Sequence, residues 1–212
     1  MFNNNLKYHF KKKLCCVIFI AVVILLLSKS VFAESENIIQ TGYFIPNFSL
    51  AGPFFKNDKS YLGLTEQKSY SLNSIRAEFI LIEFFSIYCP VCQKHADRFN
   101  HLHRLIEEDD LISRSMKMIA IGTGNNTNEI EYFKKYFNIK FPCISDPDSK
   151  IHKAFKEPRT PLLILVDKRT VPYKVLSILD FHKNTENILQ DIRKVIHNIQ
   201  SKISKPKTLS LK

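Results

Sequence analysis

Two cysteines separated by two residues are the feature of this sequence best suited to chemistry. The tetrapeptide Cys89-Pro90-Val91-Cys92 follows an apolar segment and opens a segment with helical periodicity. The N-terminus of a helix offers unpaired N–H groups and the positive end of a dipole, and both stabilise a thiolate. The spacing therefore favours a redox dithiol, in which Cys89 attacks a disulfide and Cys92, one turn further inward, resolves the mixed disulfide.

Two other interpretations of this cysteine pair stay open. A C-x-x-C can be half of a zinc site, although the sequence has no second such pair to complete four ligands. A structural disulfide across so small a loop would stabilise little in the chain-entropy model. We therefore expect no metal and no cofactor, and the redox-active group would be the Cys89–Cys92 disulfide itself.

A single acid interrupts the apolar segment that leads to the dithiol. Glu83 lies six positions before Cys89, within residues 79–85 (FILIEFF), which are typical of a central strand buried on both faces. A carboxyl group there is costly unless it has a partner or a task. We expect a carboxyl with a raised pKa beneath the dithiol, which exchanges a proton with Cys92. The alternative is an acid at the strand's end that reaches solvent or a lysine.

A Thr-Pro pair opens a later apolar strand, residues 161–167. A proline at this place is best explained by a cis Thr160–Pro161 bond, which aims the preceding backbone at the dithiol; the alternative is a trans proline that starts an edge strand. The backbone of Thr160 could pair with an extended substrate chain. The predicted substrate-binding residues are Tyr88, Pro90, Val91, Thr160 and Pro161.

The remaining periodicity predicts the elements that position these residues. Strands are expected at 79–85, 116–122, 141–144, 161–167 and 173–179, and helices at 90–108, 127–137, 145–155 and 185–201. This alternation indicates an α/β fold with a mixed four- to five-stranded sheet, helices on both faces and an antiparallel edge pair. Residues 34–78 contain scattered turn formers and are predicted to form an N-terminal β extension with a small hairpin. Residues 202–212 are predicted to be a basic, flexible tail.

The net charge would suit nucleic-acid binding, but its distribution does not. Lysine and arginine total 31 against 20 acids, a formal charge of +11, and residues 1–33 hold five lysines and no acid. Basic residues 7–13 precede an apolar run at 14–27, and Val31-Phe32-Ala33 has small residues where a signal peptidase reads. We predict that residues 1–33 are a signal peptide or an uncleaved membrane anchor, that the protein is exported, and that it binds no nucleic acid.

Export changes the interpretation of the cysteines. Cys15 and Cys16 fall in the predicted leader, so three of the five remain. Three are too few for a disulfide framework, and a close pair plus one other is more typical of redox chemistry. Cys143, flanked by Phe-Pro and Ile, is predicted to be a small apolar residue buried at a strand end, and a third redox thiol is the alternative.

The order of these motifs resembles the thioredoxin superfamily. The segment FFSIYCPVC, the acid six residues before the first cysteine and the later Thr-Pro all match. The leader, residues 46–50 (PNFSL) and the segment from Phe141 to Asp148 are similar to exported TlpA/ResA-like thiol–disulfide oxidoreductases, which overlap with the AhpC/TSA peroxiredoxin-like group. The resemblance implies a thioredoxin-like domain over 79–201. It also implies that Cys89 is the nucleophile, Cys92 the resolving thiol, Glu83 the buried acid and Pro161 the cis-proline.

The resemblance has departures and further implications. Tyr88 stands where the family usually has tryptophan, and Pro-Val between the cysteines lacks the histidine of strongly oxidising relatives, which favours a reductant. The implied partners are exported protein thiols or disulfides, including the haem-site cysteines of apocytochrome c, and a membrane thiol–disulfide electron donor. The implied location is the periplasm or the outer face of a membrane.

Two competing functions follow from the same residues. Peroxiredoxins carry a Pro-x-x-x-Thr/Ser-x-x-Cys pattern; Ser86 fits it, but Ile82 occupies the proline position, so a thiol peroxidase is the second enzymatic hypothesis. The third hypothesis is a redox-inert exported binding module or chaperone that uses only the groove.

Overall fold

The computed structural model describes residues 39–66 and 69–204. The predicted leader therefore lies outside the described residues, as do the last eight residues of the predicted tail. None of the helices in the described part of the chain is long and apolar enough to cross a membrane.

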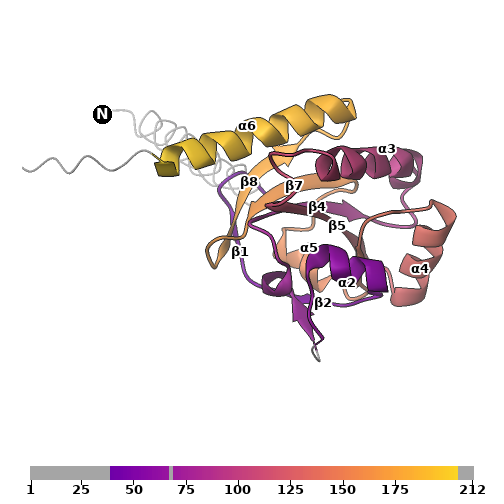
Figure 1. Cartoon of the computed structure of the whole chain (residues 1–212). Helices are drawn as coiled ribbons and strands as arrows, with labels where there is room; N and C mark the ends of the chain where they lie inside the picture. The colour runs from indigo at the N-terminus through magenta and orange to yellow at the C-terminus, as the bar shows by residue number, and fades with distance from the viewer. Residues whose placement is uncertain (1–38, 67–68, 205–212) are drawn as a thin grey trace, which may run out of the picture. The chain divides into compact units, whose positions relative to one another are not determined.

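Six strands form the main sheet, in the order β1-β8-β7-β4-β5-β6 (Figure 1). Their bounds are Phe44–Ile45 (β1), Phe79–Phe85 (β4), Met116–Thr123 (β5), Cys143–Asp146 (β6), Leu162–Asp167 (β7) and Tyr173–Leu179 (β8). Strand β4 pairs in parallel with β5, and β5 with β6, whereas β7 is antiparallel to both β4 and β8. The predicted mixed sheet with an antiparallel edge pair is confirmed, with β1 as an additional strand because two residues are too short for a period-2 pattern.

Helices cover both faces of this sheet (Figure 1). They are α2 (Lys56–Leu62), α3 (Pro90–Glu107), α4 (Thr127–Tyr136), α5 (Lys150–Ala154) and α6 (Thr185–Ser204). Helix α6 extends three residues past its predicted end, because the first residue that disfavours helix after Ser201 is Lys205, which precedes Pro206.

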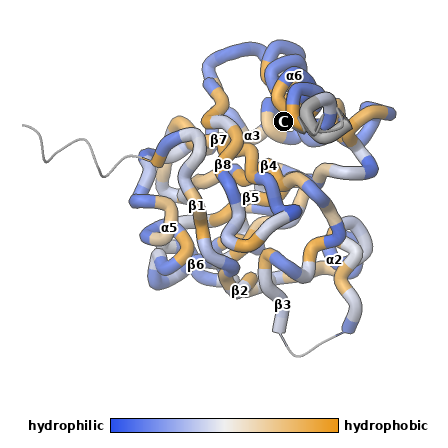
Figure 2. The backbone as a smooth tube through the Cα atoms, turned by 90° about the vertical axis from the view of Figure 1, so that its left-hand side faces the viewer, coloured by the Kyte–Doolittle hydropathy of each residue, from blue (hydrophilic) through white to orange (hydrophobic). Residues whose placement is uncertain are grey.

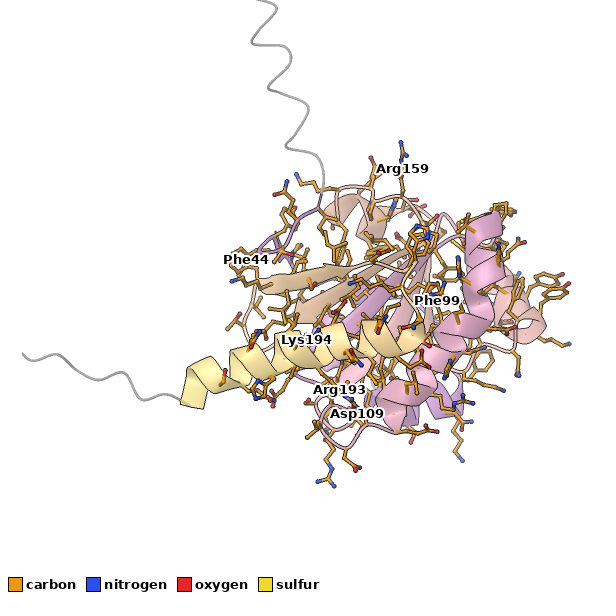
Figure 3. The ribbon with its side chains drawn as sticks, turned by 90° about the horizontal axis from the view of Figure 1, so that it is seen from above. Phe44, Phe99, Asp109, Arg159, Arg193 and Lys194 are labelled. Carbon is orange, nitrogen blue, oxygen red and sulfur yellow. The ribbon has the colours of Figure 1, made fainter. Side chains whose placement is uncertain are left out.

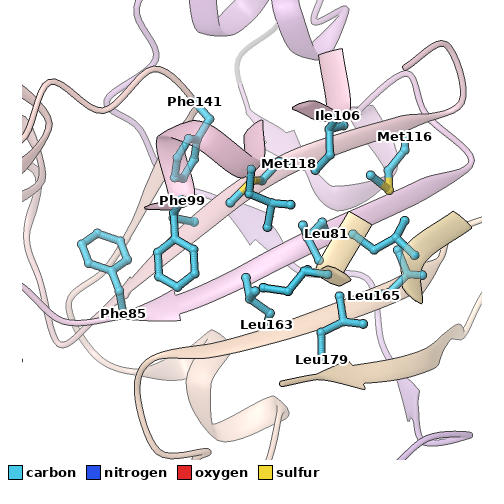
Figure 4. Packing of buried hydrophobic residues seen from close by; sticks show 14 of the residues in the cluster. Leu81, Phe85, Phe99, Ile106, Met116, Met118, Phe141, Leu163, Leu165 and Leu179 are labelled. Carbon is cyan, nitrogen blue, oxygen red and sulfur yellow. The ribbon is translucent and has the colours of Figure 1, made fainter. Parts of the chain in front are cut away.

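The alternation of side chains along β4 divides the core into two layers. Leu81 and Phe85 belong to a cluster with α3, α4 and α6, whereas Ile82 and Phe84 belong to a cluster with α2 and α5. Figure 4 shows the first layer, to which Phe85 of β4 and Phe99 of α3 both belong. Because both faces are covered, β4 is buried along its whole length, as its apolar sequence predicts.

The hydropathy of the residues along the chain agrees with this layered core. Hydrophobic segments concentrate in the central strands, and hydrophilic segments lie on the loops and outer helical turns (Figure 2).

An ion pair between Arg193 of α6 and Asp109 links this helix to the turn after α3. Figure 3 shows both side chains below the helix. Asp109 is 4% exposed.

The region around β6 differs from the prediction. A strand at 141–144 and a helix at 145–155 were expected, but the strand begins and ends two residues later and the helix is shorter. The reason is Asp146: its backbone continues the ladder with β5, while its carboxylate accepts the N–H groups of Ile151 and His152 at 3.1 and 2.9 Å. Asp146 is therefore the last residue of β6, and its side chain also caps the N-terminus of α5.

The N-terminal extension also differs from a simple hairpin. Strands β2 (Ser49–Leu50) and β3 (Tyr70–Ser71) do pair antiparallel, but α2 and a loop lie between them. Tyr61 of α2 accepts the N–H of Met118 at 2.8 Å through its hydroxyl oxygen, which covers the edge of β5 before its pairing with β6 begins. Tyr61 thereby satisfies a backbone N–H of β5 that β6 does not reach.

Candidate active site

The dithiol lies at the carboxyl end of the central strand β4. After β4 ends at Phe85, the Cys89 N–H bonds to the Ser86 carbonyl at 3.0 Å, which forms a tight turn. Cys89 is then the N-cap residue of α3, and Pro90 occupies the first helical position, where its missing N–H costs nothing. The Cys89 sulfur accepts the backbone N–H of Cys92 at 3.2 Å. The sulfur thus occupies the place of a helix-capping oxygen.

This environment stabilises the Cys89 thiolate. Partial burial would raise its pKa, but hydrogen bonds from Cys92, from the Thr160 side chain and from the Val91 N–H outweigh burial, so the pKa of Cys89 is lowered. The sulfur is half-buried and within reach of solvent. A thiolate that is both stabilised and accessible is what nucleophilic attack on a disulfide requires.

Cys92 is the opposite kind of thiol. It is 1% exposed. Its pKa is raised well above that of an ordinary thiol, mainly by burial and further by its interaction with Cys89. Both cysteines are free thiols in this structure, so the geometry is that of the reduced dithiol. The two positions of the C-x-x-C therefore divide into an accessible thiolate and a buried, protonated thiol.

The loop before β7 meets the dithiol from the other side. The Thr160–Pro161 peptide bond is cis, as the sequence predicts. The Cys89 sulfur lies 3.6 Å from the Thr160 carbonyl oxygen, to which its protonated form donates, although the two residues are 71 positions apart. Residues of the predicted site from two distant segments are therefore brought together.

Glu83 lies under this corner, in the middle of β4. It pairs with Leu163 on one side and Ala120 on the other and is 4% exposed. Burial first, and then the negative charge of Cys89, raises the pKa of Glu83 to about 8. Glu83 also lines a space too narrow for a water molecule, which it shares with Cys143 and aromatic side chains.

The predicted substrate-binding residues differ in their exposure. Tyr88 is 70% and Val91 43% exposed, and Pro90 is exposed beside them. Thr160 is half-buried, whereas Pro161 is buried. The open surface next to the Cys89 sulfur is therefore formed by Tyr88 and the first residues of α3 together with Thr160.

Two residues that follow β5, Asn125 in the loop and Glu129 in the first turn of α4, were not predicted to act at the site. The side-chain oxygen of Asn125 accepts the Ile87 N–H at 3.0 Å, and the Tyr88 hydroxyl donates to Glu129. Gly122 allows α4 to pack this close to β5, because a Cβ there would lie 2.2 Å from the Ile130 side chain of α4. The only sequence signal was the position of these residues at the carboxyl end of a strand parallel to β4, where loops converge on a site.

Cys143 is placed as expected for a structural residue. It is 1% exposed at the start of β6, and its thiol points to the Phe141 carbonyl at 3.8 Å. Burial is the main cause that raises the pKa of Cys143 above that of an ordinary thiol.

In the described part of the chain, no three His, Cys, Asp or Glu side chains are grouped so that they could hold a metal ion.

Comparison with known proteins decides the family. The model of the AhpC/TSA family matches residues 41–184, about two thirds of the sequence. The chain belongs to the AhpC/TSA family. It is 22% identical over 171 residues to thiol–disulfide oxidoreductase ResA of Bacillus subtilis, covering 79% of this chain and 81% of that protein. The resemblance predicted from the motifs is confirmed, and the predicted enzyme class, thiol–disulfide oxidoreductase, is the class of these relatives.

Solved structures confirm the thioredoxin-like fold. The thioredoxin domain of a thiol–disulfide oxidoreductase from Bacteroides vulgatus aligns with a TM-score of 0.54 at 13% identity, over 74% of this chain and 97% of that one. Peroxidoxin BcpB from Mycobacterium tuberculosis aligns with a TM-score of 0.53 at 16% identity, over 76% and 98%. Because reductases and peroxidases share this fold, the reaction must be argued from the site.

Proposed function

We propose that this AhpC/TSA-family thiol–disulfide oxidoreductase reduces disulfides of exported proteins through the dithiol Cys89–Cys92. The observation that carries the proposal is the division of labour within the dithiol. One thiol has a lowered pKa at a helix N-terminus and reaches solvent, and the other is buried three residues later with a raised pKa. Attack by the first and resolution by the second is the chemistry that this pair supports.

In the first step, the Cys89 thiolate attacks one sulfur of a substrate disulfide. A sulfur–sulfur bond forms between Cys89 and the substrate, the substrate's own disulfide breaks, and one substrate thiolate leaves. In the second step, Cys92 loses its proton and attacks the Cys89 sulfur, which releases the second substrate thiolate. The substrate gains two electrons, and the enzyme is left with a Cys89–Cys92 disulfide.

Glu83 would take the proton of Cys92 in the second step. Its pKa is raised partly by the negative charge on Cys89. When Cys89 enters the mixed disulfide that charge disappears, so the pKa of Glu83 falls and its carboxylate form becomes more favourable. More of the Glu83 side chain is therefore in the carboxylate form, which can accept a proton, at the step in which Cys92 must be deprotonated. This proton transfer would account for a buried carboxyl group in the middle of a central strand, which is otherwise costly.

The proposed direction is reduction. The groups that lower the pKa of Cys89 are hydrogen-bond donors of Cys92, Thr160 and Val91, and none of these carries a positive charge. A cation beside the nucleophile would stabilise the thiolate strongly and make the pair a stronger oxidant. Pro90 and Val91, between the cysteines, supply none, which supports a dithiol that gives up its electrons readily.

The setting is proposed from the sequence. A basic region followed by an apolar run supports export by a signal peptide or a membrane anchor. We place the protein at the extracytoplasmic side of a membrane, where protein disulfides persist and must be reduced by a dedicated donor. The electron donor would be a membrane thiol–disulfide protein, and the haem-site cysteines of apocytochrome c are one substrate class.

One assay tests this function against its rivals. The full chain is mixed with dithiothreitol and insulin, whose reduced B chain precipitates, and in parallel with dithiothreitol and hydrogen peroxide. We expect insulin reduction well above the dithiothreitol background and no matching peroxide consumption, with Cys89→Ser at background in both. Peroxide turnover without insulin reduction would show a peroxidase, and neither activity would favour a binding module.

A further inference from the structure

The loop that brings Thr160 to the dithiol has a backbone that needs support. It joins α5 to β7, and two successive residues in it, Lys156 and Glu157, have φ angles of +65° and +50°. Neither is glycine, and side chains disfavour this left-handed region. Such conformations persist where neighbouring contacts hold them in place. The contacts that hold this loop therefore also determine where Thr160 lies.

His152 of α5 supplies two of these contacts. Its Nε2 atom lies 2.8 Å from the carbonyl oxygen of Pro158. Because a carbonyl oxygen only accepts, Nε2 carries the proton and donates it. The backbone carbonyl of His152 in turn accepts the N–H of Glu157 at 3.0 Å. Side chain and backbone of one residue thus hold two successive residues of the loop.

His152 is itself held from the sheet. Its backbone N–H bonds to the carboxylate of Asp146 at 2.9 Å, and Asp146 is 4% exposed. Its ring lies 5.9 Å, between ring centroids, from that of Phe84 in β4, the strand that leads to Cys89. His152 therefore lies between the two chain segments whose ends meet at the Cys89 thiol and the Thr160 carbonyl.

We propose that His152 is a positioning residue of the redox site: through the Pro158 carbonyl it holds Thr160 against the Cys89 sulfur. The kinetic consequence rests on the proposed function, because a substrate strand that pairs with the Thr160 backbone needs the loop in place. The chemical consequence does not, because the hydrogen bond from the Thr160 side chain is one of the interactions that lower the pKa of Cys89. Displacement of the loop raises that pKa.

A set of four variants isolates the Nε2–H donor. His152→Phe keeps a ring against Phe84 but cannot donate, and His152→Met removes both ring and donor at similar length. His152→Gln restores an amide N–H near the position of Nε2. His197→Phe is the matched control, because His197 is exposed on α6. Thermal unfolding of each variant identifies those that fold, and Met replaces Phe as the test if the Phe variant does not.

The first readout is steady-state reduction of a protein disulfide by the full chain. We expect KM to rise about fivefold to tenfold in His152→Phe, the scale of one lost hydrogen bond, with kcat changed less than about twofold. The Gln variant should recover most of the loss, and His197→Phe should match the wild type. An unchanged KM in the Phe and Met variants would overturn the proposal, as would a Gln variant with the same defect as Phe.

The second readout needs no disulfide reductase activity. The rate of iodoacetamide alkylation of Cys89 is followed against pH by mass spectrometry of the Cys89 peptide. The midpoint should move upward in His152→Phe and return in His152→Gln. A midpoint that stays at the wild-type value in both Phe and Met variants would overturn the positioning role. A wild type that reduces no protein disulfide would contradict the proposed function alone, and the midpoint would still decide the role of His152.

Discussion

Two corners of the sheet place a cysteine next to a proline, and only one is built for thiol exchange. The dithiol corner, residues 88–92, follows β4, and the Cys143 corner, residues 141–143, leads into β6, whose first residue is Cys143. At the first, the Cys89 sulfur accepts an N–H from a helix N-terminus and is half exposed. At the second, the thiol of Cys143 points to a carbonyl of its own chain segment and is closed off from solvent.

The charges around the two corners differ as well. The Cys143 corner is closed by a buried ion pair, in which the Lys134 ammonium lies 2.9 Å from Asp58 and 3.0 Å from the Phe141 carbonyl oxygen. That ammonium lowers the pKa of Cys143, but burial dominates and the pKa is raised. A nearby cation thus does not make a reactive thiol without solvent access and N–H donors. A cysteine at the N-terminus of a helix has these donors and this access, whereas Cys143, at the start of a buried strand, has neither. The position of the cysteine within its element therefore matters more for its reactivity than the charges nearby.

The largest expected difference between the corners is their rate of alkylation. At pH 7, Cys89 should react with iodoacetamide at least about a thousandfold faster than Cys143, because Cys143 is both protonated and buried and reacts only when the chain opens locally. Mass spectrometry of the two peptides over time gives both rates. Adding guanidinium should make the rates similar. A fast Cys143 in the native protein would remove the contrast between the corners.

The second expected effect concerns the ion pair that closes the Cys143 corner. Asp58→Asn leaves the Lys134 ammonium without its buried counter-charge, so the free energy of unfolding should fall by about 3 kcal/mol. Denaturant unfolding measures this loss. The pH profile of Cys89 alkylation should not change, because the pair belongs to the other corner. A change in that profile would mean that the corners are coupled.

The third effect concerns Glu83, whose side chain lines the same narrow space as Cys143 but whose pKa responds to Cys89. Its folded-state pKa, about 8, is above the ordinary value of 4.5, so the folded protein binds the proton more tightly. Stability from this group is complete at low pH and is lost as the pH rises toward 8. Relative to Glu83→Gln, the wild type should lose about 2 kcal/mol between pH 5.5 and 7.5.

Unfolding curves of both proteins across this pH range give the difference directly. Parallel curves for the wild type and Glu83→Gln would mean that Glu83 keeps an ordinary pKa in the folded protein. The same variant should also slow the resolution step more than the initial attack. A resolution rate with an unchanged pH profile would exclude the proton role.

The smallest expected effect is that of removing the Cys143 thiol. Cys143→Ala leaves a small gap in a narrow space, so we expect a loss of about 1 kcal/mol in the free energy of unfolding. Insulin reduction should stay within about twofold of the wild type, because the substitution lies outside the dithiol corner. Loss of reduction in a folded Cys143→Ala protein would make Cys143 a third redox thiol.

Local sequence patterns predicted the residues that lie within one continuous segment of the site. The strand that contains Glu83 and the helix that begins at Cys89 each have their own periodicity, and a proline that opens a strand marked the Thr160 loop. These patterns work because strand burial and helix capping are decided by residues close in sequence. The β4–α3 turn could therefore be predicted almost completely.

Contacts between loops could not be predicted in this way. Asn125 lies 38 positions from Ile87, and no periodicity links a loop after β5 to the turn after β4. Asp109 belongs to an acidic run that is typical of a solvated helix end, yet it is buried because Arg193 of α6 reaches it. Such partners are fixed by the packing of whole elements, which a single sequence does not display.

The central claim, that Cys89 attacks and Cys92 resolves, is tested most directly by trapping the mixed disulfide. Full-length Cys92→Ser is incubated with a disulfide-containing protein, and the adduct is analysed by non-reducing electrophoresis and peptide mass spectrometry. We predict a stable, dithiothreitol-sensitive adduct that maps to Cys89, whereas the double variant Cys89→Ser/Cys92→Ser forms none. No adduct, or an adduct that maps to Cys143, would contradict the account.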